Sequence, residues 1–320
     1  MMMRYKAVDM KKLLFVYNPK SGSSEGIVRK LPKILKIFAA AGYQTDLYPT
    51  KAPRDGFEKI RADGANYARV VTAGGDGMLN ELVNAVMDFD EPLVTGYIPA
   101  GTVNDFATTH TIPKKVLKAA KIAVSDNLQS VDIGQFNDRY FSYVAATGFG
   151  TRASCSTDSK AKKQWKFLAY AAEALKEFNK EALKAVSRRM KVVADGVTLE
   201  GEFVFAAVSN AFSIAGMRNL TDKRCVLDDG MLEGLFIPFP ENFKKWGDIL
   251  GAFLSRDYYN SNLTYIKAKK FEITSESALW TLDGEKGGEH ETTVITAKRK
   301  ALRMAMPKTH RTFLLRKSKK

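Results

Sequence analysis

A glycine-rich run at residues 74–80, here called the glycine loop, joins a strand to a helix. The apolar stretch 69–73 predicts a short buried strand before it, and the helical spacing of Leu79, Leu82 and Val83 predicts a helix behind it. Glycines at such a junction let backbone N–H groups approach an anion and adopt positive φ, and the helix N-terminus adds partial positive charge. The run therefore predicts an α/β fold with an anion site, against the alternative of an ordinary turn with a capping aspartate.

Asp76 inside the glycine loop narrows this interpretation. A carboxylate beside a bound phosphate would repel it, unless the acid holds a water molecule or a metal ion or orients another group of the site. Asp76 is therefore a candidate for one of these three roles.

The chain has 320 residues, of which 45% are hydrophobic, and this favours two globular domains. Its two cysteines, Cys155 and Cys225, are too few and too far apart for a disulfide framework or a zinc site, so we expect a reducing compartment. The charged N-terminus has no apolar core, which argues against a signal peptide. The longest apolar stretch, 203–217, is interrupted by Ser209, Asn210 and Ser213, so we expect no membrane span.

The formal net charge is +15, and it is concentrated in two places. Residues 298–320 contain ten Lys or Arg and no acid, and residues 160–191 contain ten Lys or Arg against three Glu. In the second stretch Trp165, Leu168 and Phe178 alternate with the lysines, the pattern of a basic amphipathic helix at a membrane interface, although a core-facing helix has a similar pattern. Such clusters attract nucleic acid or an anionic bilayer.

The first part of the chain alternates strands and helices. Apolar runs predict strands at 13–17, 43–48, 69–73 and 93–98. Helical patterns fall between or after them, at 27–38, 53–66 and 79–86. The alternation predicts an open parallel sheet, in which ligands bind at the carboxyl ends of the strands. Three polar, glycine-containing loops meet that condition, at 18–24, 74–80 and 101–105.

Beyond residue 130 the pattern changes to successive strands. They are predicted at 131–136, 139–146, 190–194, 203–209, 231–238, 263–268 and 270–274. Besides the basic segment, one helix is predicted, at 241–256. Strands that follow one another in this way indicate an antiparallel sheet or a sandwich, so we place a domain boundary near residue 132.

Several common motifs are missing from the sequence. No GxxxxGK[ST] occurs, and no GxGxxG opens the first helix, which argues against P-loop and dinucleotide-binding Rossmann proteins. The histidines His110, His290 and His310 have no metal-ligand spacing, and a Ser-His-Asp hydrolase is not expected.

Two acidic turns remain as candidates. Asp228 and Asp229 precede Gly230, where carboxylate and carbonyl oxygens suit a hard cation such as Mg²⁺. Asp283 and Glu285 stand two residues apart after a strand and share a face, so one could take a proton from a hydroxyl while the other supports a metal network. The alternative for each is an ordinary β-turn.

Five motifs occur in order along the chain: Asn18-Pro19-Lys20-Ser21-Gly22, Gly74-Gly75-Asp76-Gly77, Gly101-Thr102-Val103-Asn104-Asp105-Phe106, Asp228-Asp229-Gly230 and Leu282-Asp283-Gly284-Glu285. Together they resemble the diacylglycerol kinase catalytic family, most closely the soluble bacterial lipid kinases of the diacylglycerol kinase B type. The resemblance runs from about Leu13 to Pro307. Met78 and Lys286 depart from it, standing where the family usually has Thr and Pro.

The resemblance implies a fold of class α/β plus β. The N-terminal domain would be an open-sheet nucleotide-binding domain like that of NAD kinases and phosphofructokinases, followed by a β-sandwich. On this basis residues 1–132 form the ATP-binding domain, with the C-terminal segment of about 300–320 packing back onto it, and residues 133–299 form a β-rich lipid-substrate domain.

The resemblance also implies roles for particular residues. The nucleotide contacts would be Asn18, Pro19, Lys20, Ser21, Gly22, Thr50, Gly74, Gly75, Asp76, Gly77, Met78, Leu79, Asn80, Thr102, Asn104 and Asp105. A structural Mg²⁺ would be held by Asp229 and by the carbonyl groups of Val226 and Met231, with Asp76 joining through water. Asp283 or Glu285 would be the base that accepts the lipid hydroxyl proton, and the spacing leaves open which.

The activity implied is that of an ATP-dependent kinase with Mg²⁺ as cofactor, phosphorylating diacylglycerol to phosphatidic acid. The basic surface would hold the protein at the anionic inner face of the cytoplasmic membrane, as a peripheral protein. Two alternatives stay open: a kinase of a long-chain alcohol, a sphingoid base or NAD, and a non-catalytic module that binds nucleic acid or membrane through the basic tail. We expect no nucleic-acid partner, because the acidic turns would weaken polyanion binding, and a homodimer stays open.

Overall fold

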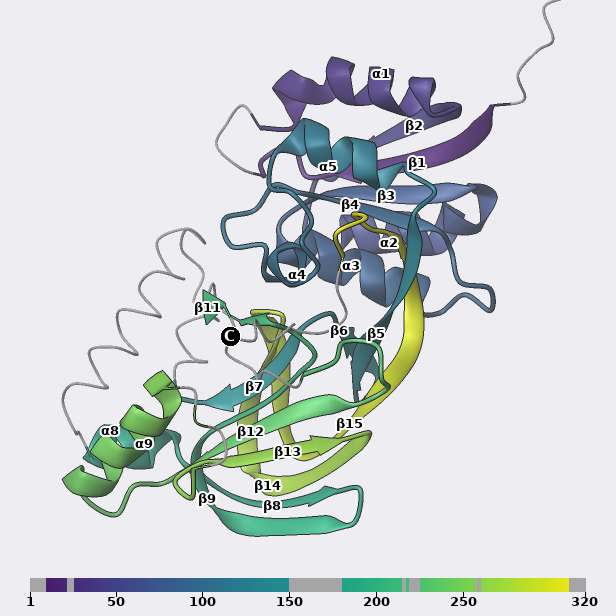
Figure 1. Cartoon of the computed structure of the whole chain (residues 1–320). Coiled ribbons are helices and arrows are strands. Elements are labelled where there is room, and N and C mark those ends of the chain that lie inside the picture. Colours follow the sequence, from purple (N-terminus) through teal and green to yellow (C-terminus); the bar gives the residue numbers. More distant parts are fainter. Residues whose placement is uncertain are drawn as a thin grey trace, which may run out of the picture. The chain divides into compact units, whose positions relative to one another are not determined.

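The computed structural model describes residues 10–21, 26–149, 180–214, 217–218, 225–255, 257 and 260–310. These residues form two compact units (Figure 1). The first contains the described residues of 1–101, 112–129 and 302–310, and the second those of 102–111 and 130–301. The chain crosses between the units several times, twice within a strand: in β5 (Leu128–Phe136) and in β15 (Glu285–Ala305).

The first unit is built on a parallel sheet. Its strands lie in the order β4 (Thr95–Pro99), β3 (Arg69–Gly74), β1 (Lys11–Tyr17) and β2 (Tyr43–Pro49). The end of β15 pairs in parallel with β4, at Met304 and Thr95. Because β2 flanks one side of β1 while β3 and β4 extend from the other, the strand order reverses between β1 and β3, which is where open α/β sheets bind ligands.

Helices cover both faces of this sheet. Figure 1 shows α1 (Leu31–Ala40) and α5 (Val116–Ala123) on one face, with α2 (Asp55–Asp63) and α3 (Asp76–Val86) on the other. Short 3-10 turns precede α1 at Val28–Lys30 and follow α2 at Gly64–Asn66. The central strands are apolar runs because both of their faces are buried, and all six residues of β3 are buried. The predicted alternation of strands and helices is confirmed.

The second unit is a β-rich unit, as predicted from the second half of the sequence. Its main sheet runs β13 (Thr264–Ala268), β12 (Leu232–Pro238), β9 (Val197–Ser209), then β14 (Lys270–Leu282) and β15, with β5 and β6 (Arg139–Phe141) beyond. Between β9 and β14 two strands lie end to end, β7 (Val144–Gly148) and β8 (Arg188–Ala194), each paired with both neighbours. These strands are hydrogen-bonded into one continuous sheet, in agreement with the predicted antiparallel sheet, and the β-sandwich stays a prediction.

The shorter elements of the second unit are α4 (Asp105–Thr109), the β10–β11 pair (Ser213–Ile214 and Met217–Arg218), α8 (Lys180–Val186) and α9 (Phe243–Ser255). The helix predicted at 241–256 is confirmed as α9. The predicted basic helix lies mostly in residues 150–179, outside the described residues, as does the end of the basic tail, 311–320.

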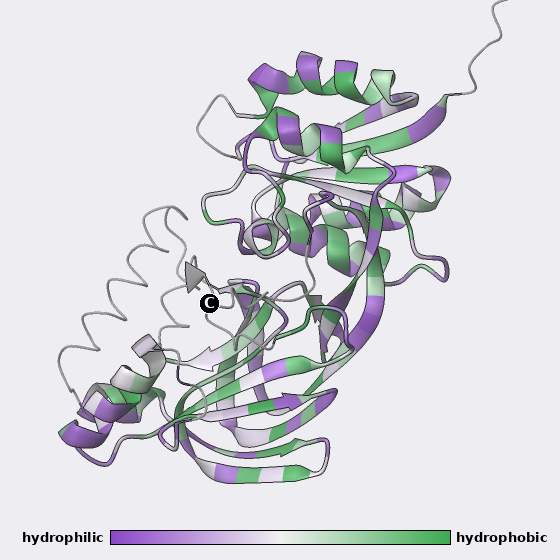
Figure 2. Cartoon of the chain, viewed as in Figure 1, coloured by the Kyte–Doolittle hydropathy of each residue, from purple (hydrophilic) through white to green (hydrophobic). Residues whose placement is uncertain are grey.

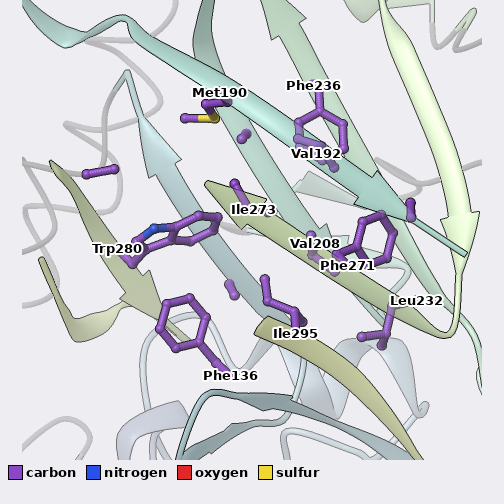
Figure 3. Close-up of a cluster of buried hydrophobic side chains, with 14 of the residues drawn as sticks. Phe136, Met190, Val192, Val208, Leu232, Phe236, Phe271, Ile273, Trp280 and Ile295 are labelled. Atoms are coloured by element: carbon purple, nitrogen blue, oxygen red, sulfur yellow. The ribbon is translucent and has the colours of Figure 1, made fainter. Parts of the chain in front are cut away.

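The main core of the second unit gathers side chains from nearly every strand of its sheet (Figure 3). Trp280 packs against Phe136 with ring centroids 5.2 Å apart, and Phe236 against Phe271 at 6.4 Å. Burial alternates along β8, where Met190, Val192 and Ala194 are buried and the residues between them are more exposed, as expected for a strand with one face on a core. Figure 2 shows that the strands of this sheet carry both hydrophobic and hydrophilic residues. A second cluster, which includes Trp246 of α9, forms a smaller core.

Several strands differ from the prediction. β9 begins six residues earlier than predicted, at Val197, and β14 continues beyond residue 274 to Leu282. The predicted strand 139–146 is broken into β6 and β7, because the N–H groups of Ser142, Tyr143 and Val144 donate to the side chain of Asp283. β15 was not predicted, since its many charged residues hide the alternation of buried Leu302 and Met304.

Candidate functional site

The junction between β3 and α3 is fixed by close backbone packing. The Gly74 carbonyl accepts a hydrogen bond from the Tyr97 hydroxyl at 3.0 Å. Glycine is required at 74, because a Cβ there would lie 2.5 Å from the Cβ of Met78. A Cβ at Gly75 would lie 3.2 Å from the Cα of Gly101, so a side chain there would crowd the neighbouring backbone. The loops that follow β3 and β4 therefore meet here, backbone against backbone.

The helix α3 begins directly behind this junction. Gly75 is its N-cap, in an extended conformation, and its carbonyl accepts the N–H groups of Met78 and Leu79. The first N–H groups of an α-helix have no partner within the helix, and together with the helix dipole they favour an anion. The glycine loop has the geometry of an anion-binding helix N-terminus.

Two further loops end at the same edge of the sheet. The Asn18 N–H donates to the Ala73 carbonyl at 3.1 Å, and the Asn18 side chain accepts the Lys20 N–H at 2.9 Å. The Thr50 N–H donates to the Tyr17 carbonyl at 2.9 Å. The first unit thus brings together these predicted residues: Asn18, Pro19, Lys20, Ser21, Thr50, Gly74, Gly75, Asp76, Gly77, Met78, Leu79 and Asn80. Gly22 lies outside the described residues.

Asp76 is nearly buried in the first turn of α3. Burial raises the pKa of Tyr97 well above its usual value, and the charge of Asp76 raises it further. Tyr97 is therefore protonated and donates to the Gly74 carbonyl.

Two carboxylates for which no role was predicted anchor the loop between β2 and α2. Glu81 of α3 accepts the N–H groups of Arg54 at 3.0 Å and Phe57 at 3.2 Å. Asp55 accepts the Lys51 N–H at 2.7 Å. The residues that follow Thr50 are therefore held at both ends. A Glu directly after the glycine loop is a weak sequence signal, because it has the pattern of an ordinary residue on a helix surface.

The end of the third predicted loop falls in the second unit. Thr102 is exposed, whereas Asn104 and Asp105 are buried, and Asn104 has the left-handed φ of 56°. The Asp105 carboxylate accepts the Ser213 hydroxyl at 2.6 Å, and the Ser213 N–H donates to the Thr109 hydroxyl oxygen at 3.2 Å. These bonds fasten α4 to β10.

The three predicted metal ligands, Val226, Asp229 and Met231, lie in or beside the turn before β12. Asp229 accepts the Met231 N–H at 3.0 Å with one oxygen and the Lys267 ammonium at 2.6 Å with the other. Lys267 also lies 3.5 Å from a Glu233 oxygen. Val226 lies just before the turn. Of this group, Lys267 and Glu233 were not predicted.

Asp132 of β5 closes the same turn and was also missed. It accepts the Gly230 N–H at 2.6 Å and the Lys300 N–H at 2.7 Å. Burial raises the pKa of Asp132; these two N–H groups lower it, and the charges of Asp228 and Asp229 raise it again. An acid in an otherwise apolar predicted strand was the signal that could have found it.

Glu233 is 1% exposed. Burial raises its pKa to about 7; Lys267 opposes the rise and Asp229 adds to it. For Lys267, burial alone would lower the pKa, but the hydrogen bond to Asp229 and the charge of Glu233 raise it overall. Carboxylates are therefore crowded around this turn, and added positive charge there would be favourable.

Asp283 and Glu285 differ from each other in burial. Asp283 is buried with a φ of 52°, and its carboxylate accepts the Ser142 N–H and hydroxyl at 2.6 and 2.9 Å, the Tyr143 N–H at 2.9 Å and the Val144 N–H at 3.2 Å. An ionised carboxylate has about four acceptor positions. These donors fill them. Glu285 begins β15 and is partly exposed.

The fold and these sites define a class of two-unit proteins, in which an open parallel sheet with an anion-binding loop is joined to an antiparallel sheet that carries acidic turns. Residues 12–136 match the family model described as the diacylglycerol kinase catalytic domain. A diacylglycerol kinase of Staphylococcus carnosus is 34% identical over 285 residues, which cover 87% of this chain and 90% of that protein. One of Staphylococcus aureus is 35% identical over 283 residues, 87% of each. The chain belongs to the diacylglycerol kinase family.

Solved structures show the same fold. The crystal structure of a diacylglycerol kinase from Bacillus anthracis aligns with a TM-score of 0.72 and 20% identity, over 94% of this chain and 98% of that one. Another structure from the same organism aligns with a TM-score of 0.77 and 22% identity, over the same shares. In the described part of this chain, no helix has the length and apolar character needed to cross a membrane.

Proposed function

We propose that this protein transfers the γ-phosphoryl group of ATP to the free hydroxyl of diacylglycerol and so forms phosphatidic acid. The observation that carries the proposal is the match to proteins named diacylglycerol kinase along 87% of the chain, at 34–35% identity. The glycine loop supports it, because phosphoryl transfer depends on positioning and charge stabilisation, and the loop offers an anion site at the reversal point of a parallel sheet.

ATP is proposed to bind in the first unit, in the manner of NAD kinases and phosphofructokinases. The helix N-terminus at Asp76–Val86 would receive phosphate, and the Asn18 loop and Thr50 would contact the nucleotide from the neighbouring strand ends. Thr102, Asn104 and Asp105 stay proposed contacts by their family positions. Asp76 would orient water and cation, since a buried acid cannot itself attract the phosphate.

The residues at the Asp229 turn fit a Mg²⁺ ion. Their oxygens are of the hard type that Mg²⁺ prefers. Burial raises the pKa of both Asp132 and Glu233 and the charge of Asp229 raises both further, so a cation beside them would favour their ionised form. Asp229 and the carbonyl groups of Val226 and Met231 would hold the ion, with Lys267 sharing the Asp229 carboxylate. When bound, Mg²⁺ would neutralise this charge and order the turn.

We propose Glu285 as the base that receives the proton of the acceptor hydroxyl. The four hydrogen bonds to the Asp283 carboxylate support this choice, because they leave it no acceptor position for a substrate. Glu285 stands two residues further along the same turn and is partly exposed. Asp283 would then fix the turn from which Glu285 acts.

The acceptor lies in a bilayer, and we propose that the protein acts as a peripheral protein on its anionic cytoplasmic face. The net charge of +15 supports this, since each Lys or Arg near such a surface contributes about 1 kcal/mol. Binding to vesicles with anionic lipid should exceed binding to neutral vesicles and should weaken with salt. Equal binding to both vesicle types would contradict the membrane proposal, and duplex DNA serves as the competing polyanion.

The activity is tested with the full chain, labelled Mg-ATP and diacylglycerol in mixed micelles. Wild type should form labelled phosphatidic acid, and Asp76→Asn should form far less. Parallel reactions contain a sphingoid base, a long-chain alcohol or NAD in place of diacylglycerol. Labelling of one of these alone would change the acceptor but keep the kinase. No labelled product with any acceptor would refute the proposal.

A further inference from the structure

Asn210 lies directly after β9 and is 2% exposed. Its side-chain NH₂ donates to two carbonyl groups, those of Asp132 and Leu227, both at 3.2 Å. Its backbone N–H donates to the Tyr143 carbonyl at 3.0 Å. One buried residue is therefore bonded to three segments of the second unit that are far apart in the sequence.

Each of these segments belongs to a candidate site. Leu227 begins the Asp229 turn, and Asp132 accepts the N–H of Gly230 in that turn. Tyr143 belongs to the interrupted strand whose N–H groups donate to Asp283. Asn210 is thus a short hydrogen-bonded link between the turn proposed for Mg²⁺ and the turn proposed for the base.

The orientation of the Asn210 amide is fixed by its partners. Turned over, it would place its oxygen against two carbonyl oxygens, which cannot donate. In the observed orientation the oxygen is buried and accepts no hydrogen bond from the described part of the chain. Such an acceptor destabilises a fold by roughly 1–3 kcal/mol. An apolar residue at this position would donate to neither carbonyl group, so the two donated bonds are what an amide supplies here.

We propose that Asn210 is a positioning residue that holds the Asp229 turn and the Asp283–Glu285 turn in one catalytic arrangement. It touches no reacting group, and its effect is transmitted through Leu227, Asp132 and Tyr143. The inference rests on the proposed kinase function, and it assigns to the second unit a residue that governs the rate of transfer and not the binding of ATP.

The test uses Asn210→Asp, which keeps the size of the side chain but replaces both donors by an oxygen facing two carbonyl groups. The matched control is Asn127→Asp, which removes an amide donor to the Met306 carbonyl in the first unit. With wild type active, Asn210→Asp should lower kcat about 10- to 100-fold, as expected for a small misplacement of reacting groups, with KM for ATP within about twofold. Asn127→Asp should keep kcat within about twofold.

Hydrogen exchange separates positioning from general destabilisation. In Asn210→Asp, exchange should rise together at residues 227–230 and 142–144 while the rest of the second unit keeps its protection. If Asn210→Asp does not fold, Asn210→Ser, which retains a smaller donor, is measured in its place. The inference is overturned if kcat is unchanged, or if kcat falls with uniformly raised exchange in the second unit. An inactive wild type would instead refute the kinase function itself.

Discussion

The two units use their carboxylates in opposite ways. In the first unit Asp55 and Glu81 each accept hydrogen bonds from neutral donors, and the N–H of Lys51 followed by the Tyr48 hydroxyl lowers the pKa of Asp55. In the second unit burial and the charge of Asp229 raise the pKa of Asp132 and Glu233, although Lys267 opposes the rise at Glu233. The first unit uses acids to brace loops, whereas the second accumulates negative charge at a turn.

This difference between the units indicates which carboxylates a bound cation would stabilise. A carboxylate that is fully hydrogen-bonded to the backbone is stable in its charged form without an ion, but crowded buried carboxylates favour a proton or a cation. Asp283 is one exception that sharpens the comparison, because it lies in the second unit and yet its carboxylate accepts four hydrogen bonds from N–H and hydroxyl donors. Asp195 of the second unit likewise accepts the N–H groups of Lys269 and Lys270.

The largest expected effect is on kcat, and it distinguishes the proposed role of Glu285 from that of Asp283. Glu285→Gln should lower kcat about 10²- to 10⁴-fold, the contribution of a general base, with little change in the melting temperature. Asp283→Asn should lower the melting temperature by several degrees, because an amide NH₂ cannot accept the N–H bonds of residues 142–144. Steady-state kinetics and thermal unfolding of both variants check this.

Glu289→Gln, an exposed Glu on the same strand, is the control and should change neither quantity. The assignment of the base is wrong if Glu285→Gln keeps the wild-type kcat while Asp283→Asn loses it without losing stability.

The first unit was largely predictable because its signals are local. Parallel strands buried on both faces appear as apolar runs, and the glycine loop lies directly between a strand and its helix. The loops at 18–24 and 74–80 could be assigned to one edge of the sheet, because parallel strands place their carboxyl ends together. Glu81 escaped notice since its partners, Arg54 and Phe57, are about 25 residues away.

The site of the second unit depends on distant contacts that no local pattern reveals. Asp132 meets Gly230 and Lys300 across 98 and 168 residues. Asn210 was seen only as a polar interruption of an apolar stretch, and its role follows from bonds to segments 78 and 17 residues away. Sequence spacing could offer Asp283 and Glu285 as alternatives, but only the donors around Asp283 distinguish them.

The next effect concerns the stability of the second unit. Glu233 titrates near pH 4.5 when unfolded and at about pH 7 when folded, so the folded state binds more protons between these values. Stability should therefore fall as pH rises through this window, by an amount on the order of 3 kcal/mol. Glu233→Gln should melt several degrees above wild type at pH 8 and at nearly the same temperature at pH 4.5. Thermal unfolding in EDTA at both pH values measures this.

Glu272→Gln, an exposed acid on β14, is the matched control and should show no such dependence on pH. If Glu233→Gln gains nothing at pH 8, the crowding of charge at the Asp229 turn is not a source of instability, and the comparison between the units fails.

The smallest expected effect tests the hydrogen bonds by which Glu81 holds the loop between β2 and α2. Glu81→Ala removes the acceptor for the Arg54 and Phe57 N–H groups at the start of α2, which should destabilise the protein by about 1–2 kcal/mol. The loop that follows Thr50 should loosen, so KM for ATP should rise about fivefold, the equivalent of about 1 kcal/mol, while KM for the lipid stays the same. Kinetics with each substrate varied in turn measures this split.

Glu58→Gln provides the control, because Glu58 lies on the same helix α2 and its side chain forms an exposed ion pair with Arg54 at 3.8 Å. Glu81→Gln, which keeps one acceptor oxygen, should fall between Glu81→Ala and wild type. If Glu81 holds the loop through hydrogen bonds, this order of KM values for ATP is expected at any ionic strength. If Glu81 acts through its charge, Glu81→Gln should match Glu81→Ala, and salt should reduce the difference from wild type. Equal rises in KM for both substrates would show that Glu81 supports the whole fold and not the nucleotide loop.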